Sequence, residues 1–345
     1  MEKPSEALKG IPVSDGWFVT EKIHKNIEAT GGFFSCGYKV QRGTDIAFLK
    51  ALDFSEAFND PDPARKLQEL TEAYNFERDL LYKCKKQHLS NIVTPICDGS
   101  VDVIGFPPGI GKVYYIIFDL ADGDIRKIKD KFIKIDIAFS FRALHNTAVG
   151  LQQLHKLGIA HQDLKPSNVM GFKEYYKVGD LGRSSDINKP FKYDNIQIPG
   201  DMSYAPIEQA YGFHFSKDFL EKKAADLYLF GSLFFFFFSG LSASQALIKK
   251  AQHMNIKFRG IFEEDLPEWE RVFSEVLLDI KDTLLILMPQ KTTQEIITLI
   301  IYLCTPDPRK RGYPGKSGSN GSKYSLERFI SRLDFLAKEA ELGII

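Results

Sequence analysis

Alternating apolar and polar residues predict strands in the first third of the chain. Turn residues separate three segments rich in aromatic and β-branched residues, which are WFVTEKI (17–23), FFSCGYKV (33–40) and DIAFLKALDF (45–54). A fourth apolar run, VYYIIFD (113–119), predicts another buried strand. The start of the chain therefore favours a small β-rich region.

Helical spacing of apolar residues dominates the rest of the sequence. Residues 64–86 predict one helix, and residues 148–160 predict a helix that ends near Gly158 and a short strand after it. Residues 242–304 are apolar and helical in pattern. The last segment, residues 324–342, predicts an amphipathic helix that docks on the helical region through Leu326, Phe329, Ile330, Leu333 and Leu336.

The most apolar run, residues 227–240, contains five consecutive phenylalanines. It is shorter than the roughly 20 residues that a membrane-spanning helix needs. A helix that is apolar on all sides is typical of the inside of a large domain. We therefore expect this helix to be buried in protein and expect no membrane as a partner.

Composition narrows the class of protein. The 345 residues include 45 basic and 45 acidic side chains, so charge gives no reason to expect nucleic acid as a partner. The four cysteines form no C-x-x-C pair, and the N-terminus lacks the apolar core of a secretion signal. We expect a cytoplasmic protein.

The most informative stretch is HQDLKPSN, residues 161–168. It places a carboxylate, an ammonium and a carboxamide on one short loop, where they can orient a hydroxyl, neutralise a phosphate and hold a metal ion. This stretch resembles the H-R-D-L-K-x-x-N catalytic loop of eukaryotic-type protein kinases. The resemblance implies that Asp163 accepts the proton of the substrate hydroxyl, that Lys165 contacts the transferred phosphate as in the Ser/Thr branch, and that Asn168 binds Mg²⁺.

Other motifs of that family follow in the family's order. AFLK, which ends at Lys50, resembles the V-A-I-K strand motif, and GDLG, with Asp180, resembles the metal-binding D-F-G segment. A lysine among apolar strand residues needs anions nearby, and in this family these are ATP phosphates and a helix glutamate. Glu77 and Asp79 both qualify for the glutamate role. We favour Glu77, because its helical neighbours are apolar.

The nucleotide-binding residues follow only from the resemblance. It implies a glycine-rich hairpin that keeps one signature glycine, a hinge at residues 119–121 and a large gatekeeper at Phe118. The residues expected to contact ATP are Gly31, Gly32, Ala47, Lys50, Asp119, Ala121 and Met170.

Three further positions match structural residues of the family. Glu208, in a segment resembling A-P-E, is expected to form a buried ion pair with Arg311 of DPRKR. Asp226 matches the acid that hydrogen-bonds the catalytic-loop backbone. Asp201 replaces the family's threonine and is expected to reach Lys165.

These resemblances, from residue 17 to residue 311, imply an α+β, bilobal protein-kinase-like fold with a small β-rich N-lobe and a larger helical C-lobe. The chain then divides into a leader (1–16), an N-lobe with its hinge (17–121), a C-lobe (122–311), a flexible linker (312–323) and a C-terminal helix (324–345). The implied function is Mg²⁺-dependent transfer of phosphate from ATP to Ser or Thr of a protein. A partner could dock on residues 242–304 or on the C-terminal helix.

Three alternatives remain open. The reduced glycine hairpin, Leu181 and Gln162 are also compatible with a pseudokinase that binds nucleotide without transferring phosphate. A small-molecule phosphotransferase with a kinase-like fold would share Asp163 and Asn168. A structural scaffold would have no use for the paired carboxylates.

Regulation by phosphorylation is a separate question. The activation segment contains Ser184, Ser185 and Tyr193 as acceptors. In many relatives an arginine at the position of Gln162 binds a phosphate on this segment, and a neutral amide cannot do so in the same way. We therefore expect activity that does not depend on a phosphate held by residue 162.

Overall fold

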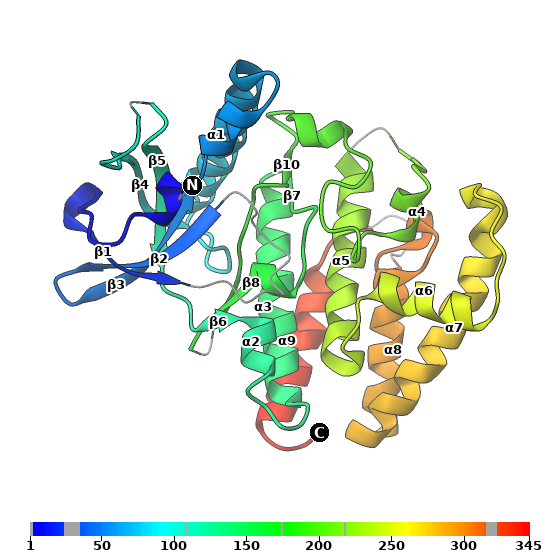
Figure 1. The fold of residues 1–345 in the computed structure, drawn as a ribbon. Helices are drawn as coiled ribbons and strands as arrows, with labels where there is room; N and C mark the ends of the chain where they lie inside the picture. Colours follow the sequence, from blue (N-terminus) through cyan, green and yellow to red (C-terminus); the bar gives the residue numbers. More distant parts are fainter. Residues whose placement is uncertain (1–2, 24–34, 108, 174, 217–218, 315–322) are drawn as a thin grey trace. The chain divides into compact units, whose positions relative to one another are not determined.

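The chain forms two compact units. The computed structural model describes residues 3–23, 35–107, 109–173, 175–216, 219–314 and 323–345 (Figure 1). The first unit comprises residues 1–122 together with Gly179–Gly182, and the second comprises Gly123–Val178 and Arg183–Ile345. The GDLG segment therefore groups with the β-rich unit, although its place in the chain lies between residues of the helical unit.

The first unit is built on a five-stranded antiparallel sheet in the order β1-β2-β3-β5-β4. The strands are β1 (Phe18–Ile23), β2 (Ser35–Arg42), β3 (Asp45–Leu52), β4 (Pro95–Asp102) and β5 (Lys112–Asp119). The predicted strands of the first third of the chain are thus present, and β4 joins them at one edge.

Alternation along the strands separates the two faces of this sheet. One face packs against the N-terminal segment in a core that contains Leu8, Trp17, Val19, Tyr38, Val40, Ala47, Leu49, Ala51, Val113, Tyr115 and Ile117. Residues of opposite parity, such as Lys50 and Tyr114, point to helix α1 (Pro63–Lys86). The side chain of Asp62 caps α1 by accepting a hydrogen bond from the Arg65 amide at 3.1 Å.

The second unit is mainly helical. Its helices are α2 (Ile125–Lys129), α3 (Ile137–Lys156), α4 (Ile207–Ala210), α5 (Phe219–Ser239), α6 (Ala243–His253), α7 (Phe262–Leu287), α8 (Gln290–Cys304) and α9 (Glu327–Glu341). Short strands pair in the orders β6-β8-β9 and β10-β7. They are β6 (Gly123–Asp124), β7 (Ile159–Ala160), β8 (Val169–Phe172), β9 (Tyr175–Val178) and β10 (Ser185–Asp186).

Helix α5 carries the phenylalanine run and is buried along most of its length. Phe234, Phe235, Phe237 and Phe238 are each at most 3% exposed, as the apolar pattern predicts. Among the described residues no single helix is long and apolar enough to cross a membrane, although α5 and α6, bent by 69°, pass that test as a pair.

The C-terminal helix α9 packs along α3 (Figure 1). Leu326, Phe329, Leu333 and Leu336 are buried, and Ile330 is half-buried. Arg142 of α3 attaches α9 by donating hydrogen bonds to Glu341 at 2.7 and 2.8 Å and to Asp334 at 3.3 Å. Docking of the last helix on the helical unit, expected from its apolar face, is therefore observed.

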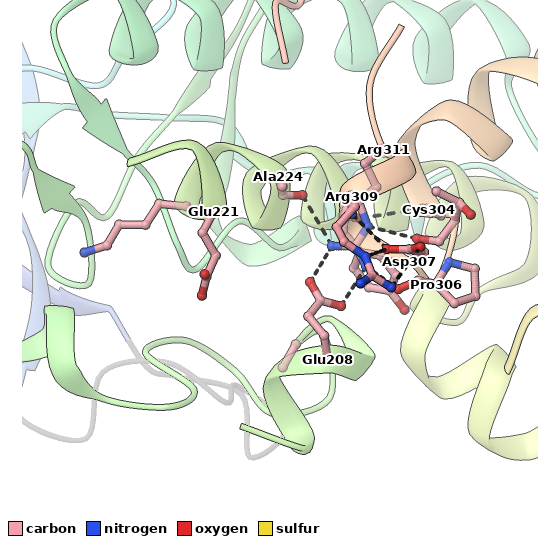
Figure 2. A network of polar contacts seen from close by, with 12 residues as sticks. Glu208, Glu221, Ala224, Cys304, Pro306, Asp307, Arg309 and Arg311 are labelled. Carbon is pink, nitrogen blue, oxygen red and sulfur yellow. Dashed lines mark hydrogen bonds and ion pairs between the residues drawn. The ribbon is translucent and has the colours of Figure 1, made fainter. Parts of the chain in front are cut away.

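Glu208 and Arg311 form a buried ion pair in the second unit (Figure 2). Arg311 Nη2 lies 2.7 Å from Glu208 Oε2, and the guanidinium also donates to the carbonyl oxygens of Thr305 and Pro306 at 2.9 and 3.3 Å. Its centre lies 4.7 Å from the ring of Tyr228. The pair thus joins α4 to the segment after α8, over 103 positions of the sequence.

Replacing Arg311 should destabilise the second unit strongly, because Glu208 would remain buried without its cation. We expect Arg311→Met to lower the free energy of unfolding by about 3–5 kcal/mol in urea titrations followed by circular dichroism. The matched control is Arg259→Met, whose side chain is 75% exposed and pairs with a Glu264 side chain that is 47% exposed, so its loss should cost about 0–1 kcal/mol. Equal losses in the two variants would show that the buried pair does not stabilise the fold.

Candidate active site

Lys50 and Glu77 form an ion pair inside the first unit. Lys50 lies on β3, and its Nζ atom is 2.7 Å from Glu77 Oε1 on α1. Glu77 is only 6% exposed and lies on the face of α1 that also buries Tyr74, Leu81 and Cys84. Asp79, the other candidate, contacts Arg78 at 3.1 Å and has a side chain that is 45% exposed. Of the two acids, the structure places Glu77 at Lys50.

Asp180 is the second carboxylate beside Lys50. Its Oδ1 atom lies 3.5 Å from Lys50 Nζ, and its backbone has a φ of 58°, which is uncommon for a residue with a side chain. Burial alone would lower the pKa of Lys50, but the carboxylates of Asp180 and Glu77 raise it well above the ordinary value. Lys50 is therefore a fixed cation between two anions.

Asp226, on α5, holds the beginning of the loop formed by residues 161–168. It is fully buried and accepts hydrogen bonds from the backbone amides of His161 and Gln162, both at 2.8 Å. The side-chain amide of Gln162 donates a third hydrogen bond to Asp226 Oδ1 at 2.9 Å. The Nε2 atom of His155 lies 2.8 Å from Asp226 Oδ2. Burial opposes ionisation, but His155 and these donors lower the pKa of Asp226 below its ordinary value.

Asp163 is held by groups on both sides of its carboxylate. The backbone amide of Asp201 donates to Oδ1 at 2.8 Å, and Asn168 Nδ2 donates to Oδ2 at 3.2 Å. Lys165 Nζ lies 3.2 Å from Asp163 Oδ2 and 3.3 Å from Asp201 Oδ2, so Asp201 does reach Lys165. These contacts fix the orientation of the one side chain that the resemblance assigns as a base.

Gly200 is required for this arrangement. A Cβ atom at this position would lie 2.6 Å from the Gln162 carbonyl oxygen and 2.7 Å from Asp163 Oδ1. Any side chain would push the activation segment away from the loop. The residue therefore allows the Asp201 amide to approach the carboxylate of Asp163.

The donor atoms expected to hold Mg²⁺ suit that ion chemically. Mg²⁺ prefers hard oxygen ligands, and Asp180 offers a carboxylate. Asn168 donates from its amide nitrogen to the Asp163 carbonyl oxygen at 2.8 Å and to Asp163 Oδ2 at 3.2 Å, and its own Oδ1 atom accepts a hydrogen bond from the Ser167 hydroxyl at 3.3 Å. Asp180 belongs to the first unit and Asn168 to the second.

The residues expected to contact the nucleotide lie in both units. Ala47 is buried on β3 and pairs in register with Asp119, the exposed end of β5, and Ala121 follows that strand. Met170 lies on β8 in the second unit and is half-buried. Gly31 and Gly32 lie outside the described residues.

The activation segment is fastened to α5 by Asp194 and Lys222. Asp194 accepts hydrogen bonds from the Lys222 ammonium, from the Ser185 hydroxyl and, at 2.8 Å, from the Phe191 amide. Burial works against these donors, which nevertheless lower the pKa of Asp194. Ser184 and Ser185 are 1% and 4% exposed, so neither hydroxyl is accessible in this conformation.

Sequence reasoning did not identify His155 or the Asp194–Lys222 pair. His155 lies on the buried face of α3, 71 positions before its partner Asp226. A histidine on an apolar helix face was the only available signal. Asp194 and Lys222 lie among other charged residues, and no spacing rule connects them.

Comparison with known proteins identifies the family of the chain. The family model for the protein kinase domain matches residues 61–314, which include Glu77, Asp163, Asp180 and Arg311 but begin after Lys50. The chain is 25% identical over 180 residues to the serine/threonine-protein kinase par-4 of Caenorhabditis elegans, an alignment that covers 51% of this chain and 27% of that protein.

Two further kinases are similar to parts of the chain. Identity to mouse serine/threonine-protein kinase greatwall is 24% over 174 residues, which cover 50% of this chain and 18% of that protein. Identity to ribosomal protein S6 kinase 2 beta of Xenopus laevis is 38% over 80 residues, or 22% of this chain and 12% of that protein. The chain thus spans about a quarter or less of the length of these relatives. Because the family match covers most of its residues, the chain belongs to the protein kinase family.

Proposed function

We propose that this protein is a serine/threonine protein kinase that transfers the γ-phosphate of ATP to hydroxyl groups of protein substrates. The observation that carries the proposal is the fixed carboxylate of Asp163, with Asn168 and Lys165 beside it. Catalysis of phosphoryl transfer consists mainly of positioning and charge stabilisation, and this loop supplies a base, a cation and an amide oxygen for both.

Each charged residue then has a role in the reaction. Lys50, held by Glu77, binds the α- and β-phosphates of ATP. Asp163 orients the substrate hydroxyl and accepts its proton, and Lys165 compensates the negative charge that develops on the transferred group. Asp180 and Asn168 would hold Mg²⁺, which supplies positive charge next to the phosphate oxygens.

A serine or threonine acceptor is favoured over a tyrosine by Lys165. It lies two residues after the catalytic carboxylate and contacts both Asp163 and Asp201. The relatives par-4 and greatwall are named serine/threonine-protein kinases. A pseudokinase is the second candidate, favoured by Leu181 in the D-F-G position and by Gln162 in place of the arginine.

Replacing Asp163 should abolish phosphate transfer without unfolding the protein. The purified chain, incubated with Mg²⁺, radiolabelled ATP and casein or histone, should place label on serine and threonine. Asp163→Asn should slow this reaction about 1,000-fold, because it removes the base while keeping the shape of the side chain. The matched control is Asp279→Asn on α7, where the side chain is 62% exposed.

Three outcomes decide between the candidates. Loss of transfer on chelation of Mg²⁺ would support the roles of Asp180 and Asn168. Nucleotide binding without any transfer by the wild-type chain would identify a pseudokinase. An Asp163→Asn variant that keeps more than a tenth of the wild-type rate would refute the assignment of the base.

Activity should persist after removal of phosphate from the activation segment. The side-chain amide of Gln162 is already used, because it donates to the Lys222 carbonyl oxygen and to Asp226, both at 2.9 Å. Asp194 supplies the negative charge that holds the segment. We expect phosphatase-treated protein to keep its turnover within about twofold, and Lys222→Met to lower it about tenfold because Asp194 loses its cation.

The neighbouring Lys223→Met serves as the control for this experiment. It removes the same charge from the adjacent position of α5, where Lys223 lies 5.5 Å from the ring of Phe219. Loss of activity on dephosphorylation, together with unchanged activity of Gln162→Arg, would contradict the prediction.

A further inference from the structure

Helix α1 is attached to the sheet of the first unit by a second polar contact besides Lys50–Glu77. The carboxylate of Asp98, on β4, accepts a hydrogen bond from Tyr82 at Oδ1 (2.7 Å) and from Tyr74 at Oδ2 (3.2 Å). Both tyrosines belong to α1. We refer to these three residues as the Asp98 anchor.

The register of the sheet places the anchor and Lys50 on the same row. Ile116 of β5 pairs with Lys50 of β3 on one side and with Asp98 of β4 on the other. Directly opposed residues of neighbouring strands point to the same face, and strands are about 4.8 Å apart. Lys50 and Asp98 therefore reach the same helix from backbone positions about 10 Å apart.

The anchor also brackets Glu77 along the helix. Tyr74 lies one turn before Glu77, and Tyr82 lies more than one turn after it. Tyr82 lies eight positions after Tyr74, which corresponds to about 12 Å of helix axis, so two contacts with one carboxylate restrict both sliding and rotation of α1. Tyr74 is 5% exposed and also packs on Tyr114 of β5, with ring centroids 5.4 Å apart.

The phenols are suited to this role. Burial, reinforced by Asp98, raises the pKa of Tyr74 and of Tyr82 above the ordinary value. Both hydroxyls therefore stay protonated and donate to the carboxylate. A hydrogen bond to a charged acceptor is stronger than one between neutral groups.

We propose that Asp98 is a positioning residue for phosphoryl transfer, which holds α1 through Tyr74 and Tyr82 so that Glu77 keeps Lys50 in place. This inference rests on the proposed kinase activity. It assigns a role in that activity to a residue that lies outside the kinase motifs of the sequence. It requires no contact between Asp98 and the nucleotide. The position of α1, and with it the Lys50–Glu77 pair, depends on two hydrogen bonds to β4, which lies two strands away from β3 in the sheet.

The first test is kinetic. Asp98→Asn should lower kcat/KM for ATP about tenfold, because one phenol then faces an amide NH₂ group in place of an acceptor. Tyr82→Phe removes a single hydroxyl from a half-buried position and should cost about threefold. The matched control, Asp102→Asn, changes an exposed carboxylate four residues further along β4 and should leave kcat/KM unchanged.

A double variant separates positioning from a general structural role. If Asp98 acts through Glu77, adding Asp98→Asn to Glu77→Gln should lower kcat/KM by less than about twofold further. A full tenfold further loss would show that Asp98 acts independently of Glu77 and would overturn the proposal.

The second test does not depend on activity. Cys84 is a fully buried thiol of α1, so its alkylation by N-ethylmaleimide, followed by mass spectrometry of the Cys84 peptide, reports on release of the helix. We expect faster alkylation in Asp98→Asn and Tyr82→Phe than in the wild type and in Asp102→Asn. Unchanged alkylation in both variants would overturn the proposal, whereas a wild-type chain without kinase activity would refute the proposed function and leave this measurement valid.

Discussion

The carboxylate of Asp226 is the interaction on which the catalytic loop depends. An ionised carboxylate without solvent is costly unless donors surround it, and here the donors are the loop backbone, Gln162 and His155. The apolar part of α5 therefore carries one buried charge, that of Asp226, where residues 161 and 162 pass the helix. This charge fixes the backbone of His161 and Gln162, and with it the starting position of Asp163.

The same requirement recurs in other parts of the molecule. Buried Arg311 is paired with Glu208, and Lys50 is paired with Glu77. The hydroxyls of Tyr74 and Tyr82 both donate to Asp98. Each of these contacts joins two different elements of the fold. For the buried pairs, removal of one partner would leave a charged group buried and unsatisfied, which costs more than the loss of the contact itself.

Much of this architecture follows from patterns in the sequence. Alternation predicts the strand that contains Lys50, a continuous apolar run predicts the strand that contains Phe118, and the phenylalanine run predicts a buried α5. The apolar neighbours of Glu77 indicate the inward face of α1, which is the face that meets Lys50. Family spacing indicates the partners Glu208 and Arg311, because these residues recur in a fixed order even when local similarity is weak.

Other features have no signal of this kind. Asp98 and its tyrosines are 16 and 24 positions apart and are brought together by a turn and by strand register, neither of which follows from periodicity. The grouping of Gly179–Gly182 with the first unit depends on contacts made after folding. Asp194 and Lys222 look like ordinary surface charges until the activation segment is placed on α5. Such long-range polar contacts are where single-sequence reasoning reaches its limit.

The central claim of the proposed function is that Lys50 and Asn168 both act on one Mg²⁺-bound ATP. Isothermal titration calorimetry with ATP and Mg²⁺ tests it most directly, using the wild type, Lys50→Met from the first unit and Asn168→Leu from the second. The account predicts one nucleotide per chain and at least about tenfold weaker binding in each variant. A second nucleotide per chain, or unchanged affinity in either variant, would contradict it.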